Sequence, residues 1–251
     1  MSFRSRHTSP IRYLLLLLVT VGVTLALSPL SLFRDRTPAA VVPLPQTDSW
    51  WITQHEQALA RVRQGNIDLV MIGDSITQGW GTEGRRIWDT YYRHRRAVNL
   101  GFNGDRTEHV LWRLHHGEID GIAPKLVVLM IGTNNTGAHH DLPEETAAGI
   151  QAILTALRTR LPTAKILLLG LFPRTASADD PIRRINGAVN DRLGAYADNQ
   201  HIFFLDLSHH FLDIRGRLPQ DLMPDFVHPN EHGYQVWADG MEDMIARLLG
   251  E

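Results

Sequence analysis

Short apolar runs recur along the chain at the spacing of a buried β-sheet. Five of them are only four to six residues long and contain few polar positions. Nearly continuous apolar runs of this length are typical of parallel strands that are covered on both faces. We therefore predict strands at residues 67–72, 97–100, 126–131, 166–171 and 202–205.

Segments with helical periodicity separate these runs. Apolar residues recur every three or four positions in residues 105–115, after Pro143, after Asp180-Pro181 and after His228. The Asp-Pro pair is a good helix start, because aspartate caps the first turn and proline fits its first position. The alternation of strands and helices predicts an α/β fold, a doubly wound parallel sheet with helices on both faces.

The N-terminal part of the chain has a different pattern. Residues 13–33 form an uncharged stretch of 21 residues, which as a helix would cross about 31 Å of hydrocarbon. A signal peptide is the competing interpretation, since Ala26 and Ser28 give a small-x-small cleavage pattern. Because Pro29 would follow that cut, we favour an uncleaved signal anchor over residues 1–33, with the catalytic domain on the extracytoplasmic side. A cleaved segment would instead give a secreted protein.

The segment that follows is rich in proline. Pro38, Pro43 and Pro45 lie within residues 34–47, a composition typical of an extended spacer. We therefore expect a proline-rich linker over 34–47 and one catalytic domain over 48–251.

Composition narrows the classes of function. The chain is 43% hydrophobic and 21% charged, as in an ordinary globular domain, and its formal net charge of −2 argues against a nucleic-acid partner. Without cysteine, thiolate catalysis and thiolate metal sites are excluded. The 13 histidines include adjacent pairs, which do not share a helix face, so apart from His228, which is considered below, we interpret them as solvated surface residues. We predict no metal and no cofactor.

Two motifs supply a nucleophile and a base. Gly73-Asp74-Ser75 follows the first predicted strand, where the Ser75 hydroxyl would project from the sheet edge. Asp225 and His228 are three residues apart, so one loop can carry both the base and the carboxylate that orients it. We interpret Asp74 as a residue that braces the turn.

Two further motifs supply hydrogen-bond donors. Gly104 follows the second predicted strand and offers a backbone N–H, while Asn134 follows the third and offers a side-chain amide. With the N–H of Ser75 they would form a three-donor oxyanion hole. Each motif alone is an ordinary turn or cap, but their order behind the predicted strands favours a catalytic site. Asp105 we interpret as structural, and Arg174, just past the fourth strand, as a solvated loop residue.

At these motifs the chain resembles the SGNH, or GDSL, hydrolase family. The resemblance extends from about Ile67 to Tyr234 and is strongest to the catalytic subunits of platelet-activating factor acetylhydrolase, above all over residues 99–135. It implies a flavodoxin-like three-layer α/β/α fold with strand order 2-1-3-4-5, and it assigns the oxyanion glycine to Gly104. Asn103 stands where a glycine is common in the family.

The resemblance also implies a short acyl pocket. Its walls correspond here to Ile76, Thr133 and Val227, none of which is tiny. We therefore expect a membrane-tethered serine esterase that removes a short acyl group, with acetyl favoured, from a small-molecule ester. The alternatives are a carbohydrate O-acetylesterase, a lysophospholipase-type lipase, and a tethered binding protein that kept the fold without turnover. The sequence leaves open whether the chain is a monomer or a homodimer.

Overall fold

Five parallel strands form the central sheet in the order β2-β1-β3-β4-β5. The structure is a computed structural model that describes residues 1–2 and 37–251. The strands are β1 (Leu69–Gly73), β2 (Ala97–Gly101), β3 (Leu126–Met130), β4 (Lys165–Leu169) and β5 (Ile202–Leu205). All residues of β1 and β3 are buried, as expected for inner strands covered on both faces. The predicted α/β class and strand order are confirmed.

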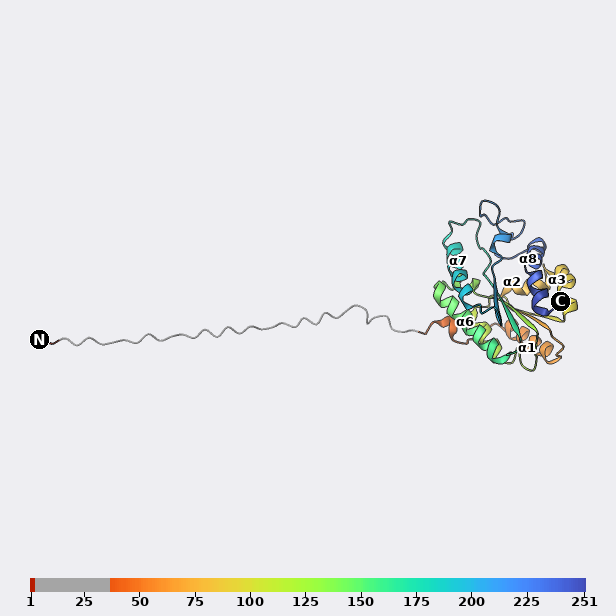
Figure 1. Cartoon of the computed structure of the whole chain (residues 1–251), viewed down its shortest axis with the longest axis horizontal. Helices are drawn as coiled ribbons and strands as arrows, with labels where there is room; N and C mark the ends of the chain where they lie inside the picture. The colour runs from red at the N-terminus through yellow and green to blue at the C-terminus, as the bar shows by residue number, and fades with distance from the viewer. Residues whose placement is uncertain (3–36) are drawn as a thin grey trace. The chain divides into compact units, whose positions relative to one another are not determined.

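Helices cover both faces of the sheet (Figure 1). One face packs against α1 (Ser49–Arg63), α4 (Thr107–His115), α6 (Pro143–Arg160) and α7 (Pro181–Leu193). The other packs against α2 (Ser75–Gln78), α3 (Arg85–Tyr91) and α8 (Glu231–Leu249). A single turn, α5 (Thr133–Thr136), follows β3. Short 3₁₀ segments are η2 (Ala39–Val41), η3 (Gly79–Gly81), η4 (Arg93–Arg95), η5 (Gly194–Tyr196) and η6 (Ser208–Phe211).

Local sequence signals account for most element boundaries. The predicted strands lie within two residues of the observed ones, and the Asp180 side chain accepts a hydrogen bond from Ile182 N (2.8 Å) as the expected cap. The helix expected from residue 105 begins at Thr107, because Asp105 belongs to the preceding turn. Helix α1 was not predicted: its sequence is largely polar, and only Trp51, His55 and Val62 are buried.

Residues 37–47 are part of the domain, so the expected spacer over 34–47 is wrong for this segment. Ala40 is 1% exposed, and its carbonyl accepts a hydrogen bond from Thr107 Oγ1 (2.9 Å). Leu44 N donates to the carbonyl of Glu108 (3.1 Å). A Cβ on Gly149 of α6 would lie 2.7 Å from the Ala40 carbonyl oxygen, so this glycine permits the close approach. The compact unit begins at Thr37 rather than at residue 48.

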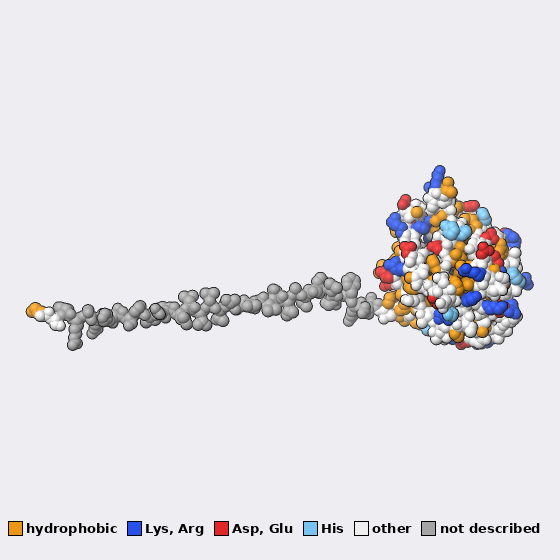
Figure 2. Space-filling model, viewed as in Figure 1, with side chains coloured by type: hydrophobic (Ala, Val, Ile, Leu, Met, Phe, Trp, Pro, Cys, Tyr) orange, Lys and Arg blue, Asp and Glu red, His pale blue; other side chains and the backbone are white. Residues whose placement is uncertain are grey.

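The expected membrane span, residues 13–33, lies outside the described residues. Within residues 1–2 and 37–251, no helix has the length and apolar character needed to cross a membrane. On the face of the domain drawn in Figure 2, acidic, basic and apolar side chains are interspersed.

The register of the sheet brings three loops together. Gly73 at the end of β1 pairs with Gly101 on β2 and with Met130 on β3. The carboxyl ends of these strands are therefore level, and the loops after them share one edge of the sheet. The space there is tight, because a Cβ on Gly101 would lie 2.2 Å from the backbone nitrogen of Gln78. Helix α2 thus packs directly on the backbone of β2.

A pair of glycine substitutions tests this packing. Gly101→Ala should lower the free energy of unfolding by about 2–3 kcal/mol, because the clashing atoms are backbone and cannot move aside. Gly187→Ala, at an exposed position of α7 with no heavy atom within 4 Å of the new Cβ, should raise it by about 0.5–1 kcal/mol. Urea unfolding measures both, and equal effects would contradict the close approach of α2 to β2.

Candidate active site

Ser75 occupies the turn between β1 and α2. Asp74 caps this short helix, its Oδ1 accepting a hydrogen bond from Ile76 N (3.0 Å), which confirms a bracing contact for this residue. Gly73 has no room for a side chain, since a Cβ would lie 2.4 Å from the carbonyl oxygen of Met130. Ser75 is the first residue of α2 and remains partly exposed, so its hydroxyl is accessible at the sheet edge.

A chain of hydrogen bonds joins Ser75, His228 and Asp225. Ser75 Oγ lies 2.9 Å from His228 Nε2, and His228 Nδ1 lies 2.7 Å from Asp225 Oδ2. When Nδ1 carries the proton and donates it to the carboxylate, Nε2 is free to accept the hydrogen of the serine hydroxyl. This geometry can deprotonate Ser75 as it attacks an electrophile.

The loop before α8 fixes Asp225 and His228 locally. Asp225 Oδ1 accepts hydrogen bonds from the backbone nitrogens of Val227 (3.0 Å) and His228 (2.7 Å). Partial burial raises the pKa of Asp225, but the hydrogen bonds from His228 and Val227 outweigh it and leave that pKa below its ordinary value. The carboxylate is therefore charged and oriented. Phe226 adopts a left-handed conformation (φ 60°), a strained backbone that is typical of functional loops.

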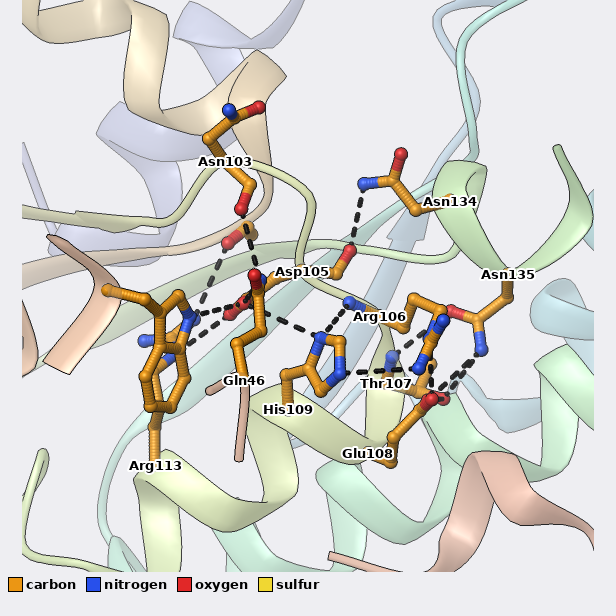
Figure 3. A network of polar contacts seen from close by, with 12 residues as sticks. Gln46, Asn103, Asp105, Arg106, Thr107, Glu108, His109, Arg113, Asn134 and Asn135 are labelled. Atoms are coloured by element: carbon orange, nitrogen blue, oxygen red, sulfur yellow. Dashed lines mark hydrogen bonds and ion pairs between the residues drawn. The ribbon is translucent and has the colours of Figure 1, made fainter. Parts of the chain in front are cut away.

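The three expected donors lie in the loops at the same edge of the sheet. Gly104 has φ +71°, which favours glycine, and Asn134 lies in the turn α5, after a Gly132 with φ +128°. Asn134 Nδ2 donates to the backbone carbonyl of Asp105 (2.9 Å), so one hydrogen of the amide orients the side chain and the other remains available. This contact links the loops after β2 and β3, as Figure 3 shows.

An open cleft of about 610 Å³ adjoins Ser75 and His228. Its other lining residues come from the end of α2, the segment after it, the loop that leads to α8 and the start of α8, and they include Gln78, Glu83, Pro224 and Tyr234. Ile76 and Thr133 are outside this lining and are 2% and 3% exposed, and Val227 is half-buried. Two of the three proposed acyl walls, Ile76 and Thr133, therefore lie beneath the surface, and the role of all three stays a prediction.

Arg174 also lies at this edge, and the prediction that it is a solvated loop residue is wrong. It is half-buried rather than solvated, and its guanidinium donates to the carbonyl of Thr133 (2.9 Å). Burial lowers the pKa of Arg174, while the negative charges of Asp74 and Asp225 act in the opposite direction. A Cβ on Gly137, the residue that follows α5, would lie 2.0 Å from the guanidinium. The absence of a side chain at Gly137 therefore leaves the space that the guanidinium occupies. In the sequence, only its position just after the fourth strand indicated that Arg174 could lie near the site.

Two histidines also depart from the expected solvated surface. His55 and His109 are each 5% exposed, and burial lowers the pKa of His109 to about 4. His109 is therefore neutral near pH 7 and accepts a hydrogen bond from Arg106 N (3.1 Å) at Nδ1. His139 and His140 are exposed, as expected.

Comparison with known proteins shows the family of the chain. The profile of the GDSL-like Lipase/Acylhydrolase family matches residues 71–236. The chain belongs to this family. Platelet-activating factor acetylhydrolase IB subunit alpha2 of Rattus norvegicus is 35% identical over 221 residues, which cover 86% of this chain and 94% of that protein. Subunit alpha1 of Homo sapiens is 34% identical over 207 residues, covering 82% and 87%. Family membership and these relatives make the chain a carboxylic ester hydrolase.

Solved structures show the same fold at lower sequence identity. A GDSL-like lipase from Bacteroides thetaiotaomicron is 20% identical, with a TM-score of 0.59 over 78% of this chain and 97% of that one. An acetylxylan esterase from Geobacillus stearothermophilus is 21% identical, also with a TM-score of 0.59, over 74% and 95%. The sheet and its helices are thus shared with GDSL esterases.

Asp74 generates a prediction about stability and pH. Burial raises its pKa from 3.8 to about 7, although the hydrogen bond from Ile76 N acts in the opposite direction. The folded protein therefore holds a proton that the unfolded chain has released, and stability falls as pH rises from about 4 to 7. Asp74→Asn removes this dependence. Its stability relative to the wild type should increase by about 2–3 kcal/mol between pH 5 and pH 8. Urea unfolding at both pH values measures this, and a difference independent of pH would contradict it.

Proposed function

We propose that the protein is a serine esterase that hydrolyses short acyl esters, acetyl esters above all, through an acyl-enzyme. The observation that carries the proposal is the hydrogen-bonded chain from Ser75 Oγ through His228 to the Asp225 carboxylate. Membership of a family of acylhydrolases supports the same reaction class.

In the first half of the reaction Ser75 becomes acylated. Ser75 Oγ attacks the ester carbonyl carbon while His228 Nε2 takes the hydroxyl proton, and Asp225 stabilises the resulting imidazolium. The tetrahedral intermediate then breaks the bond to the alcohol oxygen, which receives the proton from His228. In the second half a water molecule attacks the acyl-enzyme carbonyl carbon while His228 Nε2 takes one of its protons. The bond between the acyl carbon and Ser75 Oγ then breaks, His228 returns the proton to that oxygen, and the carboxylic acid is released.

The negative charge on the former carbonyl oxygen would be stabilised by three N–H donors. These are the backbone nitrogens of Ser75 and Gly104 and the second amide hydrogen of Asn134. Among the residues described, neither backbone nitrogen has a hydrogen-bond acceptor in the protein, so both remain available to a substrate. Donors fixed before the substrate arrives are worth several kcal/mol in the transition state.

Two considerations support a short acyl group. The relatives at 34–35% identity are named acetylhydrolases. Ile76, Thr133 and Val227, which adjoin Ser75, Asn134 and His228 in the sequence, would close the acyl side of the site. A carbohydrate O-acetylesterase and a lysophospholipase-type lipase use the same chemistry, and they differ in the alcohol and in the acyl length.

We also propose that residues 13–33 tether the domain to a membrane, with the active site on the extracytoplasmic side. The support for the tether is the uncharged length of this stretch. The orientation rests mainly on the usual topology of signal anchors, because three arginines before the span against two after it, Arg34 and Arg36, give only a slight positive-inside bias.

Ser75→Ala should abolish ester turnover. The expected loss in kcat is about 10⁴-fold or more, with the thermal midpoint unchanged, because one partly exposed oxygen is removed. Hydrolysis of p-nitrophenyl acetate and labelling by a fluorophosphonate probe measure the loss. Ser49→Ala, at the exposed start of α1, is the matched control and should be fully active. Wild-type protein that neither turns over esters nor reacts with the probe would indicate the alternative, a binding protein on a hydrolase fold.

Acyl length gives a second test of the proposal. Acetyl and propionyl esters should have a higher kcat/KM than octanoyl esters, because a long chain would collide with Val227 and its neighbours. Val227→Ala should extend the accepted length by shortening this wall. A series of p-nitrophenyl esters measures both effects, and faster turnover of octanoyl than of acetyl esters by the wild type would favour a lipase.

A further inference from the structure

Gln46 contacts the loop that carries the proposed oxyanion glycine. Its Nε2 donates to the backbone carbonyl of Asn103 (3.1 Å) and to Oδ1 of Asp105 (2.8 Å). These are the residues on either side of Gly104, and a Cβ on Gly104 would lie 3.7 Å from the same nitrogen. One amide group from the segment before α1 therefore spans the loop, as the close-up in Figure 3 shows.

Asp105 connects this contact to the other proposed donor. Its carboxylate is 0% exposed and also accepts hydrogen bonds from Trp51 Nε1 (2.7 Å) and Arg113 Nε (2.8 Å). Its backbone carbonyl accepts the hydrogen bond from Asn134 Nδ2 (2.9 Å). The position of Asp105 thus sets both the backbone beside Gly104 and the orientation of the Asn134 amide.

We propose that Gln46 is a positioning residue for the oxyanion hole, which holds the Asn103–Asp105 loop so that the Gly104 N–H and the Asn134 amide are fixed before the substrate binds. The inference rests on the proposed function and adds to it a residue from the segment that was expected to be a spacer. Gln46 acts through the loop and does not touch the reacting atoms.

The chemistry of the contact favours an amide at this position. Both acceptors, a carbonyl oxygen and a carboxylate oxygen, need a donor, and the two hydrogens of one Nε2 can serve both. Trp51 and Arg113 hold the Asp105 carboxylate from the buried side, whereas Gln46 is half-buried and approaches from the exposed loop. Loss of Gln46 should therefore loosen the loop without exposing the buried charges. The expected effect is on catalysis more than on stability.

The test uses the full-length chain with two variants of Gln46. Gln46→Met keeps the approximate length of the side chain and removes both N–H donors. Gln46→Glu places a carboxylate, which can only accept, against the Asn103 carbonyl and the Asp105 carboxylate. Each should lower kcat for acetyl esters by about 10- to 100-fold, because misplaced donors lose part of a stabilisation that is worth 10²–10³-fold per donor. KM should change less than about two-fold, since the oxyanion exists only after attack. Gln151→Met, on the exposed face of α6, is the matched control.

Hydrogen exchange gives a readout that does not depend on activity. The Asp105 N–H donates to the Phe102 carbonyl (3.1 Å) and closes the loop. This amide should exchange faster in Gln46→Met than in the wild type and the Gln151→Met control, with the thermal midpoints of all three within a few degrees.

The outcomes separate this inference from the proposed function. Unchanged kcat in both Gln46 variants, an effect on KM alone, or a fall in kcat with unaltered exchange at Asp105 would each overturn the positioning role. If the wild type hydrolyses acetyl esters and Ser75→Ala does not, such a result leaves the proposed function intact. If Ser75→Ala retains wild-type turnover, the proposed function itself fails.

Discussion

The register between β1 and its two neighbours is the constraint on which the site depends. Because Gly73 pairs with both Gly101 and Met130, the loops after β1, β2 and β3 leave the sheet at one level. A parallel sheet places all its carboxyl ends on one edge, but only a level register lets short turns carrying Ser75, Gly104 and Asn134 share that edge. Glycines at the ends of β1 and β2 then permit α2 to pack on the strand backbone, which fixes the Ser75 turn.

Beneath this edge, a buried charge cluster contacts the loop after β2. Arg113 is 0% exposed and contacts the carboxylates of Asp105 and Glu118, while its guanidinium lies 3.9 Å from the centre of the Phe102 ring. Burying such charges is costly unless each is paired and hydrogen-bonded, and removing one partner typically costs about 3–5 kcal/mol. Here the pairing is nearly complete, so the cluster resists displacement. Asp105 belongs to this cluster, and its backbone carbonyl accepts the hydrogen bond from the proposed donor Asn134. Displacing Asp105 would therefore disturb both the cluster and the orientation of that amide.

The base and its carboxylate, His228 and Asp225, come from the C-terminal part of the chain. His228 lies 153 positions after Ser75, and the loop that carries it is anchored by α8. Tyr234, in the first turns of α8, donates from its hydroxyl to the carbonyl of Ile76 (2.7 Å) and so connects α8 directly to the helix that begins at Ser75. This tie is buried among aromatic residues, including Trp80 and Trp237. The nucleophile and the base are therefore connected through packed helices as well as by their own hydrogen bond.

The sequence by itself determined what depends on near neighbours: the five strands from their apolar runs, the cap at Asp180, and the pairing of Asp225 with His228 across three residues. It also indicated the residues of the candidate site, because their motifs follow strands whose ends must share an edge. Tertiary structure alone decided the rest. Helix α1 is too polar to stand out by periodicity, and it is stabilised by the burial of Trp51 and Val62 against the domain. Gln46 and Asp105 are 59 positions apart, and Arg174 reaches the Thr133 carbonyl across 41. Such contacts leave no periodic trace in the chain, since they arise only when the sheet brings distant loops to one edge.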